Sequence, residues 1–179
     1  MQRDILEQTL DQVETVLIEL QKLPPMIADR LYVETRCGVH VRHILDHWRA
    51  ILRIYTQSED IVDYDRRNRY SEIESNREAC QNAIQLIHED IIKTNTERDR
   101  AIRIKSEFDT ESEQSGLFAS SLKREWLYVI NHTIHHLAHI RLLLNNEGVK
   151  LPEHLGVAPS TRTFQRSDDE ATAEKPVPA

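Results

Sequence analysis

Histidines crowd one stretch of the chain, residues 131–140, which reads NHTIHHLAHI. Four of the protein's nine histidines fall within these ten residues. A buried imidazole loses hydration, and neighbouring imidazoles repel one another once protonated, so a buried cluster needs a shared partner that binds the neutral form. A divalent metal ion is such a partner. The alternative is a set of imidazoles that are only hydrogen-bonded in the core.

Helical spacing selects the histidines that can act together. His132, His136 and His139 lie on one face within a sector of roughly 60°, because successive helical residues step about 100°, and His135 lies at its edge. His132 and His136 form an H-x3-H pair that can reach one ion from one helix. Thr133 stands where an H-E-x-x-H metalloprotease has its glutamate, so that activity has no support. A third ligand has to come from elsewhere.

A second histidine stripe lies in the segment 37–56. His40, His43 and His47 are spaced i, i+3 and i+7, so a helix here would present them on one face. Two inward histidine stripes on two helices are the arrangement from which helix bundles build metal sites. Three neutral imidazoles suit Zn, Ni, Fe or Mn, and we expect one divalent ion per chain.

The elements that must position these stripes are four amphipathic helices. Apolar residues at the 3.6-residue period predict helices over about 4–22, 37–56, 71–93 and 120–146. Ser71 with Glu74 matches a capping box, and Gly148 is expected at the end of the last helix. We expect the stretch 26–36 to be a connection rather than a helix. The predicted fold class is all-α, a four-helix bundle.

Two segments depart from the helical pattern. Between residues 94 and 116, Ile102, Ile104 and Phe108 follow a period of two, which predicts a short irregular or extended insertion between the third and fourth helices, either a small hairpin or a loop. From residue 159 to 179 the apolar pattern fades into Ser, Thr, Pro, Ala and mixed charge. We therefore expect a bundle domain over 1–158 and a disordered tail over 159–179.

Length and charge exclude some classes of function. The 179 residues suit about one domain, and the formal net charge is −7 with acidic and basic residues interspersed, which disfavours nucleic-acid binding. No long apolar run or signal peptide is visible, so we expect a cytoplasmic protein without a membrane partner. Cys37 and Cys80 stand apart and fit buried thiols in a reducing compartment.

The segment 63–70 is densely polar and follows the second histidine stripe. Its arginines could hold a carboxylate on two points, and a tyrosine could donate a hydrogen bond at the mouth of a site. The candidate substrate-binding residues are therefore Tyr64, Arg67 and Arg69. The alternative is a solvated linker whose charges pair among themselves.

The run from Gly38 to His47, taken with Asn131–His136, resembles the DinB-like superfamily of metalloenzymes over roughly residues 1–150. That resemblance implies a four-helix bundle in which His43, His132 and His136 bind the ion. It leaves His40, His47, His135 and His139 as additional or supporting ligands. Leu137-Ala138-His139 follows His136, where many members have Arg-Gly-Gln.

The resemblance also implies a reaction class. Characterised members include thiol-dependent transferases, so we expect a small-molecule substrate and a low-molecular-weight thiol such as glutathione. A metal-dependent hydrolase is the alternative, with Asp46, Glu125 or His139 as the catalytic base. A third possibility is a non-catalytic metal-binding or dimerising bundle, and we expect a homodimer.

Overall fold

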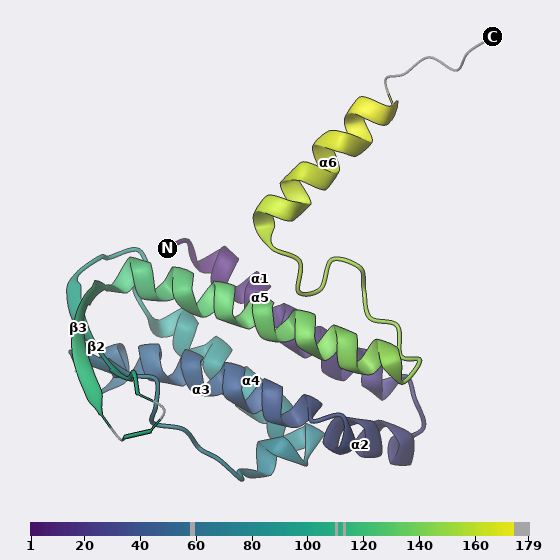
Figure 1. The fold of residues 1–179 in the computed structure, drawn as a ribbon, viewed down its shortest axis with the longest axis horizontal. Coiled ribbons are helices and arrows are strands. Elements are labelled where there is room, and N and C mark those ends of the chain that lie inside the picture. The colour runs from purple at the N-terminus through teal and green to yellow at the C-terminus, as the bar shows by residue number, and fades with distance from the viewer. Residues whose placement is uncertain (58–59, 110, 113, 174–179) are drawn as a thin grey trace.

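Four long helices form the body of the protein. The computed structural model describes the backbone of residues 1–57, 60–109, 111–112 and 114–173, with side chains to residue 167. The helices are α1 (Arg3–Gln21), α3 (Cys37–Thr56), α4 (Arg77–Lys93) and α5 (Leu122–Asn146). Helices α1 and α3 each pack against both α4 and α5, so the four close into a bundle (Figure 1). Their buried residues recur at the helical period, as the sequence predicts.

The expectation of an all-α fold is wrong. The described residues contain six α-helices and a three-stranded mixed sheet, with strands β1 (Ile61–Asp63), β2 (Ala101–Glu107) and β3 (Ser115–Ser121). Strand β1 pairs in parallel with β2, and β2 pairs antiparallel with β3. The sheet lies across one end of the bundle (Figure 1). The insertion is thus the hairpin formed by β2 and β3. Strand β1, which precedes α4 in the sequence, pairs with β2 as the third strand.

The sheet forms because it buries one apolar face. Ile102 on β2 is 5% exposed and Val62 on β1 is fully buried, whereas their charged neighbours point outward. The period of two at Ile102 and Ile104 is therefore confirmed as a strand signal. Strand β1 has three residues and pairs with a partner about forty positions away, Ile61 opposite Arg103. No local pattern reveals such a pairing.

A helix and a 3₁₀ turn occupy segments that the sequence describes differently. The stretch expected to be a connection forms α2 (Pro25–Glu34), which begins on Pro25 and buries Ala28, Leu31 and Tyr32. The expected capping box is absent, since Ser71 precedes the 3₁₀ helix η1 (Glu72–Glu74) and Asn76 caps α4 by accepting the amides of Glu78 and Ala79. Helix α4 consequently begins at Arg77 and not at Ser71.

The C-terminal part first returns along the bundle and then leaves it. Gly148 ends α5 with a positive φ of 81°, as the sequence predicts, and Leu155 in the following loop is fully buried. The segment expected to be a disordered tail is a helix, α6 (Pro159–Ala173), which projects away from the bundle (Figure 1). Residues 174–179 of that predicted tail lie outside the described residues. Among the described residues, none of the helices has the length and apolar character needed to span a bilayer.

Candidate metal centre

Helices α3 and α5 pack together and carry the two histidine stripes. The buried Trp48 on α3 donates its Nε1–H to Thr133 Oγ1 on α5 at 3.0 Å. A buried donor left without an acceptor would cost about 1–3 kcal/mol, so this bond favours one register between the helices. In that register, the two stripes face each other.

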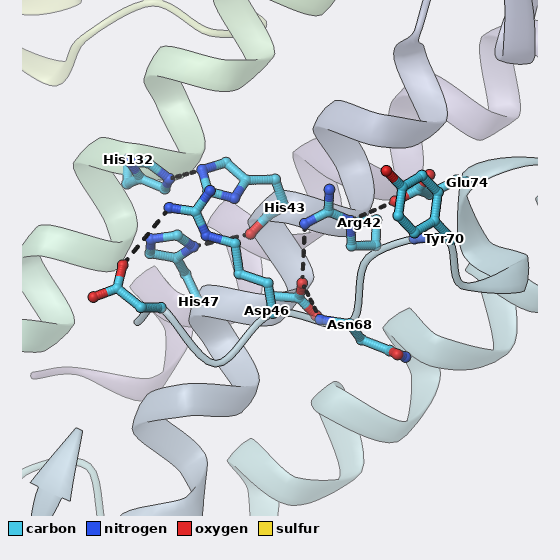
Figure 2. A network of polar contacts seen from close by, with 10 residues as sticks. Arg42, His43, Asp46, His47, Asn68, Tyr70, Glu74 and His132 are labelled. Carbon is cyan, nitrogen blue, oxygen red and sulfur yellow. Dashed lines mark hydrogen bonds and ion pairs between the residues drawn. The ribbon is translucent and has the colours of Figure 1, made fainter. Parts of the chain in front are cut away.

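Three histidines bring their ligand nitrogens together, and we call His43, His47 and His132 the inner triad. The Nε2 atoms of His43 and His132 are 3.1 Å apart, and one nitrogen from each of the three lies within 4.8 Å of the others. His47 contacts the His43 carbonyl oxygen through Nδ1 at 3.0 Å. Because a carbonyl only accepts, His47 carries its proton on Nδ1 and keeps a lone pair on Nε2. Figure 2 shows the three rings converging between the two helices.

His136, which the resemblance implies as the third ligand, does not join that group. Its Nδ1 lies 2.9 Å from Nδ1 of His40, so the two rings face each other beside the inner triad. His47 takes the place that was expected for His136. His135 and His139 are exposed on the next turn of α5, where their rings contact each other. The structure thus places His135 and the candidate base His139 at the rim.

The inner triad has the chemistry and spacing of a transition-metal site. Two nitrogens held about 2.05 Å from one ion, at an angle of 90–110°, lie roughly 2.9–3.4 Å apart. The separation of 3.1 Å between His43 and His132 falls in this range. Three neutral imidazoles suit Zn, Ni, Fe or Mn and leave a coordination position open. The group can therefore hold a divalent ion without a further protein ligand.

Burial keeps these imidazoles neutral, which is the form that binds metal. Desolvation is the largest cause, and the neighbouring histidines add to it: together they lower the pKa of His43 to about 2, of His132 to about 3 and of His136 to about 4. Desolvation also lowers the pKa of His47 and of His40. At neutral pH these five imidazoles are therefore uncharged.

A buried ion network anchors the segment 64–74 to α3, as Figure 2 shows. Arg42 donates through Nη1 to Asp46 at 3.1 Å and through Nε to Glu74 at 2.9 Å. The amides of Asn68 and Tyr70 donate to these same two carboxylates. Asp46, a candidate catalytic base, is thus occupied by Arg42 and a backbone amide. Sequence reasoning missed Arg42, although its i, i+4 spacing to Asp46 was visible.

Of the three candidate substrate-binding residues, two lie at the histidines. The ring of Tyr64 stacks on His47 at 4.9 Å, and its hydroxyl donates to Glu125 at 2.8 Å. The positive charge of Arg67 contributes to the lowered pKa of His43, His47 and His132, which places its guanidinium near them. Arg69 is exposed. The polar segment therefore reaches the centre through Tyr64 and Arg67.

A cavity of about 300 Å³ opens beside the inner triad. Tyr128 forms part of its wall and contacts His132, with the ring centroids 5.5 Å apart. Glu125, 2% exposed, also lines it and accepts from Ser120 Oγ at 2.5 Å as well as from Tyr64. The full lining comes from the sheet, the β1–η1 segment and the start of α5: Tyr64, Ile104, Ser106, Phe118, Ala119, Ser120, Arg124, Glu125 and Tyr128. The sequence predicts a hairpin or a loop here but not its place against the start of α5, so these residues could not be assigned to a site from sequence.

Comparison with known proteins gives a partial match. No protein-family model and no solved structure matches the chain. FK506-binding protein 5 of Rhizopus delemar is 31% identical over 102 residues, which is 56% of this chain and 26% of that protein. The match therefore spans about a quarter of that relative.

Proposed function

We propose that this protein is a metal-dependent enzyme whose divalent ion is bound by His43, His47 and His132. The observation that carries the proposal is the convergence of three imidazole nitrogens within 4.8 Å on two packed helices. The facing stripes on α3 and α5 also support a distant relation to the DinB-like superfamily, with His47 in the position of the third ligand. When bound, an ion of this kind acts as a Lewis acid and lowers the pKa of a thiol or a water molecule.

The cavity next to the inner triad is the substrate site that we propose, and catalysis at the ion requires the two aromatic rings that separate them to move aside. Tyr64 and Tyr128 stand between it and the histidines, since Tyr64 stacks on His47 and Tyr128 contacts His132. The guanidinium of Arg124 lies 5.5 Å from the centre of the Tyr128 ring and pairs with Glu125 at 3.2 Å, so the wall combines an aromatic surface with an ion pair. A small molecule with an apolar body and a polar group that joins this ion pair fits the wall, and glutathione conjugation is the reaction that we propose.

Metal-dependent hydrolysis is the second candidate, and the buried Glu125 favours it. This carboxylate lines the cavity, accepts hydrogen bonds from Tyr64 and Ser120 and pairs with Arg124, and it would act as a base by exchanging one of these partners for water. Asp46 is a poorer candidate because it does not line the cavity and is bound by Arg42 and the Asn68 amide.

The two reactions are separated by assaying one metal-loaded preparation in parallel. Glutathione consumption with an aryl halide tests the transferase, and turnover of an activated ester tests the hydrolase. His43→Ala should abolish the activity. His154→Ala should retain it, because His154 is an exposed histidine in the loop after α5. Activity in neither assay with Zn, Ni, Fe or Mn, in protein that binds the ion, would refute an enzymatic role and leave a structural metal.

A further inference from the structure

A second pair of imidazoles faces across α3 and α5 next to the inner triad. His40 lies three residues before His43, and His136 lies four residues after His132, so the antiparallel helices repeat the same juxtaposition one turn along. The Nδ1 atoms of His40 and His136 are 2.9 Å apart. The ring of His139 lies parallel to that of His40, with 5.8 Å between centroids and 8° between planes.

This second pair has the spacing of ligands on one ion. A separation of 2.9 Å lies at the short end of the roughly 2.9–3.4 Å expected for two nitrogens about 2.05 Å from one metal. The same separation fits a hydrogen bond between neutral rings, but that bond satisfies only one nitrogen of each ring. Burial and neighbouring histidines lower the pKa of both residues, so both remain neutral ligands at pH 7. The exposed ring of His139 stacks beside His40 and does not bring a nitrogen into this pair, so solvent would complete the coordination.

We propose that His40 and His136 bind a second transition-metal ion, adjacent to the inner triad and closer to solvent, and we call this pair the outer site. The two pairs lie about one helical turn apart, and the ring centroids of His43 and His136 are separated by 4.7 Å. Ions in the two sites would therefore lie roughly 5.4 Å from each other. The protein ligands are imidazoles only, which selects Zn, Cu or Ni over Mg or Ca. The inference goes beyond the proposed enzyme, because the outer site can fill whether or not the inner one supports catalysis.

Zinc stoichiometry tests the second site. Stripped protein is dialysed against excess zinc, and the bound zinc is measured by elemental analysis. We expect two ions per chain in the wild type, one in His40→Ala and one in His47→Ala. His154→Ala and His88→Ala should keep both. The His88 variant matters because Asp11, Glu14 and His88 also place three ligand atoms within 4.8 Å of one another between α1 and α4.

Copper provides a second, spectroscopic measurement of the same pair of sites. Two Cu(II) ions about one helical turn apart couple magnetically, so the copper-loaded wild type should show a half-field resonance in its electron paramagnetic resonance spectrum. His40→Ala should lose that resonance and retain the signal of an isolated ion with nitrogen ligands.

Four results would overturn the second site. Two zinc ions in His40→Ala, or loss of the second ion in His88→Ala, would place that ion elsewhere. One ion in the wild type, without copper coupling, would refute the outer site and leave the proposed enzyme intact. If neither the wild type nor any of the variants binds an ion, both the outer site and the proposed function are refuted.

Discussion

At the scale of single residues, Arg42 decides how the segment beside the metal centre is held. Its guanidinium contacts Asp46 and Glu74 from two different nitrogens, and these carboxylates accept backbone amides of the segment 64–74. A lysine side chain carries the same positive charge, but it has one nitrogen and cannot contact two carboxylates from two different nitrogens. We expect Arg42→Lys to lower the free energy of unfolding by about 2 kcal/mol, since one charge-assisted hydrogen bond is lost.

Urea denaturation measures this change. Arg53→Lys is the matched control, because Arg53 lies on the same helix and is only half-buried. If the two substitutions lower the free energy of unfolding equally, the contacts of Arg42 to both carboxylates do not add stability.

The histidines make the metal-free protein sensitive to acid. Burial holds the pKa of His43 at about 2 and of His132 at about 3, below the ordinary value of 6.5. The unfolded chain therefore takes up protons below about pH 6.5 while the native state does not, so stability is unaffected above that pH and falls as the pH drops toward 4. Direct competition between protons and metal at these sites begins only near their folded pKa values.

We therefore expect stripped protein to melt at a lower temperature at pH 5.5 than at pH 7.5, while metal-loaded protein keeps its ion at pH 5.5. His43→Leu removes one such group and should flatten the pH dependence of the stripped protein. A dependence that is as steep in His43→Leu as in the wild type would contradict the assignment. Elemental analysis after dialysis at each pH gives the metal content.

At the scale of elements, the close approach of α3 to η1 depends on a glycine. A Cβ on Gly38 would lie 2.2 Å from the Glu74 carbonyl oxygen and 2.6 Å from the Tyr32 ring, and the Tyr32 hydroxyl donates to the Ile73 carbonyl at this contact. We expect Gly38→Ala to lower the free energy of unfolding by about 1–3 kcal/mol through overpacking. Faster trypsin cleavage in the segment 64–70 should accompany this loss.

Gly148→Ala provides the comparison, because its Cβ would meet open space and the cost comes only from the positive φ. That substitution should lower stability by about 1–2 kcal/mol and leave the trypsin pattern unchanged. Accelerated cleavage of the segment 64–70 in Gly148→Ala, or none in Gly38→Ala, would contradict the packing argument.

The sequence predicts those features that depend on local periodicity. The apolar stripes of α1, α3 and α5 and the two histidine faces follow from residue spacing. The pairing of Ile61 with Arg103 does not, because strand partners far apart in the chain leave no local pattern. The convergence of His47, and not His136, with His43 and His132 depends on ring orientations across two helices, which spacing along one helix cannot supply.

At the scale of the whole molecule, α6 stands apart from the bundle (Figure 1). Its described side chains from residue 161 to 167 are exposed, including Phe164 at 70%. We expect truncation after Ala158 to reduce the helical circular dichroism signal and to leave the metal content and melting temperature unchanged. A truncated protein that binds less metal would show that α6 supports the centre.

If α3 and α5 hold a divalent ion through His43, His47 and His132, that ion should stabilise the fold, and thermal melting of stripped protein measures this. An ion bound only to the native state at a hundredfold excess over its dissociation constant adds about 2.7 kcal/mol of stability. For a chain of this length, that raises the melting temperature by roughly 5–10 °C. We expect this shift with Zn, Ni, Fe or Mn in the wild type and in His154→Ala, but not in His43→Ala or His132→Ala. No shift with any ion in the wild type, or an equal shift in His132→Ala, would contradict this assignment of the metal site.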